Sequence, residues 1–454
     1  MKMGSDCYKK FIRNIKTSIN LLKTKIGSHF STDPLLKGVV IIGSGTVISQ
    51  ALGLVFLPLI TRIYPPLIYG TLAVFISLIT ILVDGSAFRY ELAIPLPEKD
   101  EDAVYLLILS LSIVSILTFI LFWILVISGD FLAGIFHFEF MKSYYWLFCF
   151  GFFGISVYNI LIYFAIRSKD YVKITHTKIS QSVSGAISKI ILGILSFGSF
   201  GLICGEVIGR MAGIVTLGRT VLPKMWQSIK NFNIDKLKSI AKQYKRFPIF
   251  SMPASFINEM ALQAPVVLLS IIFGFQVVGL YSLSYTILVA PVSFISSSMA
   301  QVFFGETSDL LRQKSDGILV QYLKTTRKLF LFGAPIILVG AVISPLLFPF
   351  IFGSAWKGAG IFSLPLSIMV IAQFVVSSTD RLELYGYNHW ELAWNICRTF
   401  SVLFGFYLAF QLKLSPLVTI LLYSSIMTFM YAICYILNIK AIKRVLKNEF
   451  AIKN

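Results

Sequence analysis

Residues 38–84 read GVVIIGSGTVISQALGLVFLPLITRIYPPLIYGTLAVFISLITILVD, and this stretch decides the fold. An α-helix needs about 20 mostly apolar residues to cross the hydrocarbon core of a bilayer. The stretch contains two such runs, at 38–61 and 68–84, separated by a short turn with two adjacent prolines. The sequence therefore predicts two membrane-spanning helices joined by a short loop.

The composition of the whole chain agrees with a membrane protein. Of its 454 residues, 56% are apolar and 13% are charged, and the mean hydropathy is +0.80. An ordinary soluble domain carries roughly 25% charged residues. The composition therefore argues against a soluble enzyme, a disordered protein and a nucleic-acid-binding protein, despite an excess of 40 Lys and Arg over 21 Asp and Glu.

Further apolar runs of suitable length follow along the chain. They predict an all-α polytopic membrane protein with about twelve transmembrane helices. Charged residues interrupt the fifth and sixth runs, which are the most polar of the set. The spans are expected at 38–61, 68–84, 103–127, 145–166, 179–199, 200–218, 248–273, 276–303, 329–352, 358–379, 389–412 and 414–438.

The distribution of positive charge predicts the orientation, because cytoplasmic segments are enriched in Lys and Arg. With the N-terminus inside, 33 of the 40 basic residues fall in cytoplasmic segments, and only Arg62, Lys142, Lys357 and Lys413 fall outside. Both termini are therefore expected in the cytoplasm. The longest outer loop, near 128–144, has about 17 residues, which leaves no room for an outer catalytic domain.

The spans divide into two groups of six. The longest internal polar segment, 219–247, separates an N-lobe at 38–218 from a C-lobe at 248–438. This cytoplasmic linker and the basic N-terminal segment 1–37 each contain an amphipathic helix suited to lie on the anionic inner leaflet. A basic cytoplasmic tail is expected at 439–454.

A weak internal echo also favours duplication. Tyr69-Gly70 at the start of the second span corresponds to Val278-Gly279 at the start of the eighth, and a proline precedes each pair in the previous span. We therefore expect two pseudo-symmetric six-helix bundles with a site between them.

Ionisable side chains inside spans are costly and mark a substrate path or an ion pair. Glu206 and Arg210 are four residues apart on one helix face and can pair. The same helix carries a glycine at every fourth position from Gly201 to Gly213, which allows close helix packing. A structural pair and a substrate-path role remain equally open. Lys189 has no carboxylate at helical spacing, which favours an aqueous, anion-accepting cavity.

Two more intramembrane charges lie in the second half. Glu259 is a candidate proton or cation site, or else the partner of Arg398, and the sequence leaves both open. A passage lined by Lys189, Arg210 and Arg398 suits phosphate or acidic sugars. The chain lacks a P-loop motif, and its four histidines and five cysteines show no metal-like spacing, so no cofactor is expected.

Three motifs resemble those of a known family. QALGLVFLPLITRIYPPLIYG at 50–70 resembles the first-helix signature of Wzx-type polysaccharide flippases, whose superfamily also contains the MATE drug exporters and the lipid II flippases. FRYELAIPLP at 88–97 is similar to the family's junction between the second and third helices. FGSAWKGAG at 352–360 is similar to its turn between the ninth and tenth helices. With the span plan, the resemblance covers essentially the whole chain.

The resemblance implies a MATE-like, V-shaped pair of bundles that carries undecaprenyl diphosphate-linked oligosaccharide from the inner to the outer leaflet of the bacterial cytoplasmic membrane. The cargo would serve O-antigen, capsule or a related polymer. Arg62 and Glu91 lie in matched motifs, so the resemblance implies a role in the pathway for both. H⁺ or Na⁺ is a possible coupling ion, through Glu206 or Glu259. A polysaccharide polymerase and a chain-length regulator are possible partners.

Other functions remain open at this point. A MATE-type cation-coupled drug exporter would be expected to use acidic intramembrane residues, and here cations are at least as prominent. A membrane glycosyltransferase, polymerase or ligase would be expected to carry larger outer loops. A lipid II flippase commonly has two more spans than this chain. The flippase of lipid-linked oligosaccharide, which is not an enzyme, therefore remains the leading hypothesis.

Replacing Lys189, Arg210 and Arg398 together by Ala is expected to abolish surface polymer, because the passage would lose its attraction for an anionic head group. The measurement is the amount of surface polysaccharide at a normal protein level in the membrane. Unchanged polymer would refute the cationic passage.

Overall fold

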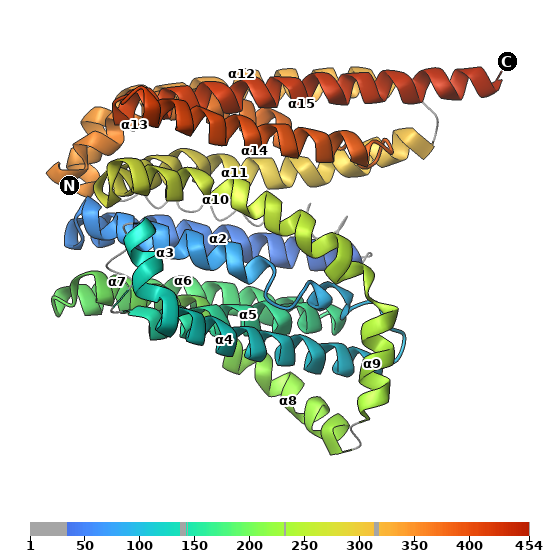
Figure 1. Ribbon diagram of the computed structural model, residues 1–454. Coiled ribbons are helices and arrows are strands. Elements are labelled where there is room, and N and C mark those ends of the chain that lie inside the picture. Colours follow the sequence, from blue (N-terminus) through green and yellow to red (C-terminus); the bar gives the residue numbers. More distant parts are fainter. Residues whose placement is uncertain (1–33, 137–141, 143, 231–232, 313–316, 454) are drawn as a thin grey trace, which may run out of the picture.

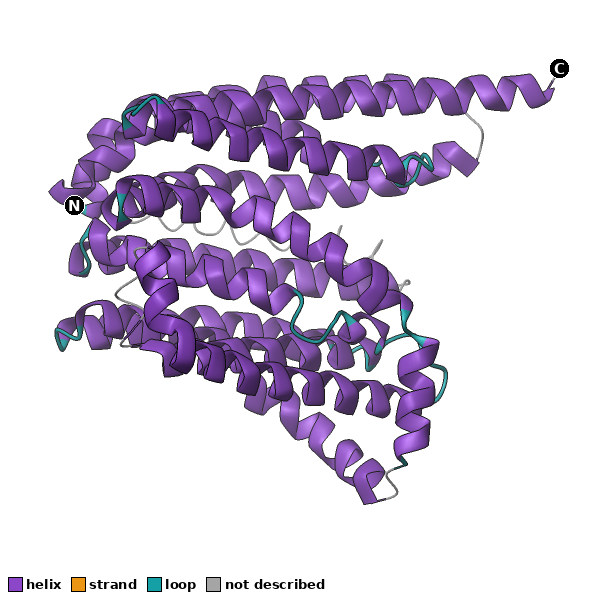
Figure 2. Ribbon diagram, viewed as in Figure 1, coloured by secondary structure: helices purple, strands orange, loops and turns teal. Residues whose placement is uncertain are grey.

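The computed structural model describes residues 34–136, 142, 144–230, 233–312 and 317–453. These residues are helical almost throughout, and no strand occurs among them (Figure 2). In Figure 1 the first half of the chain, in blue and green, forms one layer of long, roughly parallel helices. The second half, in yellow to red, forms a second layer beside it.

The first half contains one long helix for each expected span except the last, which is divided. Its elements are α2 (Pro34–Ile63), α3 (Pro66–Asp84), the short 3₁₀ turn η1 (Tyr90–Ala93), α4 (Asp100–Phe136), α5 (Tyr145–Arg167), α6 (Tyr171–Ile194), α7 (Gly198–Met211) and α8 (Ile214–Lys230).

The short helix α9 and the single π-turn η3 connect the halves, and six long helices follow. These elements are α9 (Ile234–Gln243), η3 (Phe247–Ser251), α10 (Met252–Phe273), α11 (Phe275–Arg312), α12 (Gly317–Phe352), the 3₁₀ turn η4 (Ser354–Trp356), α13 (Lys357–Ser377), α14 (Asn388–Gln411) and α15 (Pro416–Lys453).

Eleven helices among the described residues are long and apolar enough to cross a membrane, one fewer than expected. The missing one is α6, which was expected at 179–199 and begins earlier, at Tyr171. Its 24 residues would extend about 36 Å at 1.5 Å per residue, enough to cross a bilayer. Helix α6 tolerates its polar residues because Lys178, Gln181 and Ser182 form hydrogen bonds with α2 and α7 and do not face lipid.

Several helices extend past the expected membrane boundaries. Helices α11 and α12 take up most of the expected loop 304–328, and α15 takes up nearly all of the expected tail 439–454. Helix α4 likewise covers half of the expected outer loop 128–144. Hydropathy predicts only the part of a helix that lies in the hydrocarbon core, whereas the helix itself can continue into water. The expected amphipathic helix in 1–37 lies almost wholly outside the described residues.

Helix α9 lies within the linker expected at 219–247 and packs one face on the N-lobe. The expected position of this linker on the inner leaflet stays a prediction. Ile240 is buried, and the Tyr90 hydroxyl donates to the carbonyl of Ala241 at 3.0 Å. On the same face of α9, one turn before Ile240, Lys236 pairs with Glu101 at 2.8 Å and with Asp102 at 3.1 Å, at the start of α4. The N-lobe thus neutralises one of the basic residues of this helix.

The outer surface of the helices is apolar. Large side chains such as Ile127, Leu346 and Phe350 are between 77% and 79% exposed. In water such a surface would promote aggregation, whereas in a bilayer the apolar side chains contact the lipid tails favourably. Together with the eleven apolar helices, this surface makes the chain a multi-pass membrane protein.

The two halves meet where α3 packs against α10 and α11. A Cβ placed on Gly70 would lie 1.8 Å from the carbonyl oxygen of Phe275, and one placed on Gly279 would lie 2.0 Å from that of Pro66. Only glycine allows backbones to approach this closely. The two contacts are reciprocal, with Gly70 and Gly279 at equivalent places. This geometry supports the duplication that the sequence echo suggested.

A buried tryptophan seals the same end of the bundle, here called the Trp356 end. The Trp356 indole N–H donates to the carbonyl of Thr61 at 2.8 Å, and its ring packs edge-on against Tyr69 at 5.5 Å. Leu57 of α2 and Phe348 of α12 belong to the same buried cluster. Side chains of both halves therefore close this end. The opposite end, with the loops at 85–99 and 378–387, is called the Arg89 end.

Gly70→Ala is expected to lower the stability of the folded protein by about 1–3 kcal/mol, because the added methyl group overpacks the α3–α11 crossing. The measurement is the melting temperature of the purified protein. Gly340→Ala is the matched control, since no atom lies within 4 Å of a Cβ at that position in α12. Equal melting temperatures for the two variants would contradict the close crossing.

Candidate functional site

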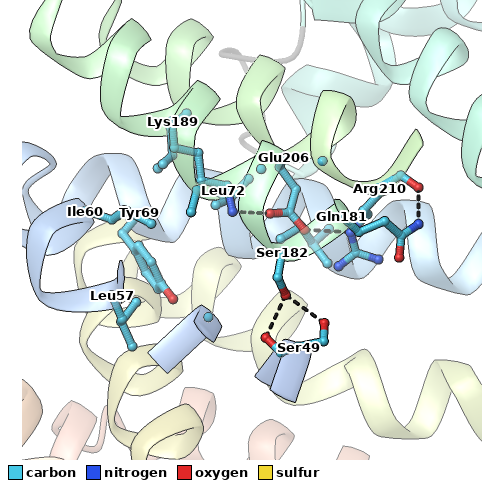
Figure 3. Close-up of a pocket in the computed structure, with 16 residues that line it drawn as sticks. Ser49, Leu57, Ile60, Tyr69, Leu72, Gln181, Ser182, Lys189, Glu206 and Arg210 are labelled. Atoms are coloured by element: carbon cyan, nitrogen blue, oxygen red, sulfur yellow. Dashed lines mark hydrogen bonds and ion pairs between the residues drawn. The ribbon is translucent and has the colours of Figure 1, made fainter. Parts of the chain in front are cut away.

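A cavity of about 360 Å³ lies inside the first half, between α2, α3, α6 and α7 (Figure 3). Its wall is apolar on the α2 and α3 side, where Leu57, Ile60 and Leu72 lie. The α6 and α7 side is polar and charged, with Gln181, Ser182, Lys189, Glu206 and Arg210. Ser49 adds one polar group from α2.

Three of these residues form one ion cluster. The carboxylate of Glu206 accepts a short hydrogen bond from the Lys189 ammonium at one oxygen. Its other oxygen accepts from Arg210 Nε at 2.6 Å. The side chain of Glu206 is 14% exposed, that of Lys189 16% and that of Arg210 37%. With two cations and one anion, the cluster carries a net positive charge and leaves the Arg210 guanidinium the most open.

Glycines in α6 and α7 bring these charges together. A Cβ on Gly209 would lie 2.6 Å from the Cα of Gly185, and a Cβ on Gly205 would lie 2.7 Å from the backbone nitrogen of Lys189. The two helices therefore approach closely along the predicted glycine row. The expected pairing of Glu206 with Arg210, both on α7, is confirmed by their hydrogen bond of 2.6 Å.

The expectation that Lys189 lacks a carboxylate partner is wrong. Its partner Glu206 lies on the next helix, 17 positions along the chain, and helical spacing within one helix does not reveal it. Arg210 shares that carboxylate, so the cationic excess of the cavity comes from the cluster as a whole and not from a free lysine.

A set of neutral polar residues supports the cluster, and the sequence analysis missed it. Gln181 donates to the carbonyl of Arg210 at 2.5 Å, and the Tyr64 hydroxyl donates to that of Lys189 at 2.8 Å. The hydroxyls of Ser49 and Ser182 lie 2.7 Å apart between α2 and α6. The polarity of the 179–199 run was the available signal, because such residues avoid lipid.

Arg62 lies outside this cavity, at the Trp356 end. Its Nε donates to the carbonyl of Ile351 at 3.2 Å, and its Nη2 donates to that of Phe350 at 2.8 Å. These carbonyls belong to the last turn of α12, where a helix has unpaired acceptors and a partial negative charge. The side chain thus links α2 to α12, and its role in the substrate pathway remains a prediction.

Glu91 lies near the Arg89 end, within η1, and does not line the cavity. It is 6% exposed, and its Oε2 has no hydrogen-bond partner among the described residues. Arg89 is 3.9 Å away and pairs more closely with Asp84, at 2.5 Å. Burial raises the pKa of Glu91 to about 7, so this carboxyl group changes its protonation near neutral pH.

Arg398 and Glu259 are not paired with each other by any contact that the structure gives. Arg398 is buried, donates to Asn258 at 2.9 Å and lies over the ring of Trp394 at 4.7 Å. Glu259 accepts from Gln263 at 2.8 Å on its own helix. Neither residue is among the lining residues of the N-lobe cavity that holds the Lys189 cluster. Among the described residues no group of His, Cys, Asp and Glu is arranged to hold a metal ion.

The sequence pattern of the family described as "Polysaccharide biosynthesis protein" matches residues 59–360, well over half of the chain. The chain belongs to this polysaccharide biosynthesis family. The match includes most of the cavity wall, from α3 to α7, and the crossing of α3 with α11. No curated protein matches the sequence.

Solved structures share the fold of this polysaccharide biosynthesis family protein. The lipid II flippase MurJ, in an inward closed conformation, has a TM-score of 0.65 and 13% identity, over 91% of each chain. A multidrug resistance MATE transporter of the MOP superfamily, facing inward, has a TM-score of 0.58 and 13% identity, over 89% of this chain and 95% of its own.

A mutant of the MATE transporter VcmN from Vibrio cholerae has a TM-score of 0.51 and 12% identity, over 91% of this chain and 97% of its own. At such identities the likeness concerns the fold, and it confirms the all-helical MATE-like architecture expected from the sequence.

Glu206→Gln is expected to destabilise the protein more than Lys189→Met, because it leaves two cations facing each other without their shared carboxylate. The double variant should lose less stability than the sum of the losses of the two single variants, with a coupling free energy on the order of 1–3 kcal/mol. The measurement is unfolding of the purified protein. Glu259→Gln is the control, since Glu259 has a neutral partner. If both Gln variants lost equal stability, the cluster would have no special role.

Proposed function

We propose that this polysaccharide biosynthesis protein is a flippase. It moves undecaprenyl diphosphate-linked oligosaccharide repeat units from the inner to the outer leaflet of the bacterial cytoplasmic membrane, for a surface polysaccharide such as O-antigen or capsule. The family and the fold support a lipid-linked flippase or a MATE-like transporter.

The observation that carries the proposal is the net positive cluster of Lys189, Glu206 and Arg210 inside the N-lobe cavity. A diphosphate diester has two negative charges, and moving it through bare hydrocarbon would be prohibitive. A cavity with an accessible guanidinium provides charge-assisted hydrogen bonds instead. The polyprenyl tail stays in lipid, where its burial costs nothing.

Transport by alternating access requires that only one end of the bundle be open at a time. The Trp356 end is held closed by Trp356, by Arg62 and by the glycine crossing. This end would face the outside of the cell, with both termini in the cytoplasm, and the excess of basic residues in the segments at the opposite end supports this orientation. In this state the cargo would enter from the inner leaflet.

An ion gradient can supply the driving force. Glu206 is a poor carrier for H⁺ or Na⁺, because two cations already occupy its carboxylate. Glu259, whose described partner is the neutral Gln263, is the better candidate. A polymerase and a chain-length regulator would use the cargo on the outer side.

A second candidate function is a MATE-type cation-coupled drug exporter. A cavity between the halves is lined by Tyr281, Tyr285, Tyr423 and Tyr431, and aromatic faces bind organic cations. A drug-sensitivity panel on a deletion strain tests this alternative.

Deleting the gene is expected to make complete lipid-linked oligosaccharide accumulate while surface polymer disappears, because assembly continues inside without export. The measurement is the amount of diphosphate-linked oligosaccharide in extracted lipids, together with surface polymer, with the wild-type gene restored as a control. Unchanged lipids with new drug sensitivity would instead establish the exporter.

A further inference from the structure

The cavity between the halves is separate from the Lys189 cluster. Its volume is about 450 Å³, within the range of about 300–1,000 Å³ that is usual for small-molecule sites. Residues of α3, α10, α11, α13 and α15 line it. We infer that this cavity binds the neutral sugar rings of the cargo, while the N-lobe cavity binds the charged part. The inference rests on the proposed function.

Tyrosine rings form one wall of this cavity. Tyr281 and Tyr285 stack with their ring centres 6.0 Å apart and their planes 6° apart. Tyr423 packs edge-on against Tyr281 at 6.5 Å, and Tyr431 also lines the cavity. Such rings offer flat apolar faces together with a hydroxyl. The C–H faces of a pyranose ring complement flat aromatic faces.

Neutral hydrogen-bonding groups lie beside these rings. Gln263 and Gln373 line the cavity. Gln263 gives one N–H to Glu259, and Gln373 accepts from the Tyr285 hydroxyl at 3.4 Å, so each amide keeps further donor or acceptor capacity. The buried Ser282 hydroxyl, also in the lining, has no hydrogen-bond partner among the described residues. A buried polar group without a partner costs free energy. Sugar hydroxyls can both donate to and accept from these groups.

The charges of the lining favour a sugar over an organic cation or a diphosphate. No Asp, Glu, Lys or Arg is among its described lining residues. The nearby carboxylate of Glu259 is bonded to Gln263 one turn along α10. The N-lobe cavity, in contrast, holds the cations Lys189 and Arg210. A ligand with a charged part and a neutral part matches this division.

The two cavities share part of one wall, which α3 provides. Tyr69, Leu72 and Ile76 of α3 line both of them. These positions lie along one stripe of a helix, so the two cavities lie on adjoining sides of the same wall. A head group that reaches past α3 can therefore contact both.

The test uses the full chain, purified in a polyoxyethylene detergent without sugar, and measures binding from the shift in melting temperature. The probes are the lipid-linked oligosaccharide extracted from the deletion strain and farnesyl diphosphate, which has no sugar. Gln263→Leu with Gln373→Leu is expected to weaken binding of the oligosaccharide lipid by about tenfold or more, since hydrogen bonds are lost. Binding of farnesyl diphosphate should not change.

Gln276→Leu is the matched control, because Gln276 is exposed on α11 and is not in the lining. Thr286→Val, of nearly equal shape, gives a second test at an exposed lining position should the double variant fold poorly. Retained sugar-dependent binding in the folded variants, or an equal loss for both probes, would overturn the inference while leaving the flippase intact. The inference would also be overturned if the wild-type protein bound the organic cation tetraphenylphosphonium and the double variant did not. Failure of the deletion strain to accumulate lipid-linked oligosaccharide would instead refute the proposed function.

Discussion

The close crossing of α3 and α11 is the contact on which the rest of the structure depends. Gly70 and Gly279 each face a backbone carbonyl of the other helix, at distances that exclude any side chain. Because the contact is reciprocal, it fixes one pseudo-symmetric relation between the halves. Trp356 and Arg62 can then reach across to α2 and α12 at the same end. Both cavities border α3 and therefore depend on where this crossing places it.

A second glycine contact fixes the approach of two helices inside the first half. Gly185 and Gly209 allow α6 and α7 to approach until Lys189 and Glu206 meet. An ionised group in hydrocarbon is tolerated only with partners, and here one carboxylate serves two cations. The excess charge remains available to an anionic ligand. The same cluster thus pairs the buried charges of α6 and α7 and provides a positive charge for an anionic ligand.

The two cavities differ in chemistry although they share a wall. Cations lie in the N-lobe cavity, whereas neutral amides and tyrosines line the cavity between the halves. A transporter for a molecule with an anionic link and neutral sugars needs both kinds of surface. The exposed apolar side chains of the exterior supply a third kind of surface, which suits the lipid tail of such a molecule.

The sequence by itself determined the membrane class, eleven of the twelve spans and the division into halves, because apolar runs of about 20 residues suit only a bilayer. It also determined the pair of Glu206 with Arg210, which is local to one helix. Only the tertiary structure gave Lys189 its carboxylate, paired Arg398 with Asn258 instead of Glu259, and joined Arg62 of α2 to carbonyls of α12. These contacts join residues on different helices, and helical periodicity carries no information about which helices become neighbours. The cavity of tyrosines and amides arises for the same reason, since its walls come from five helices of both halves.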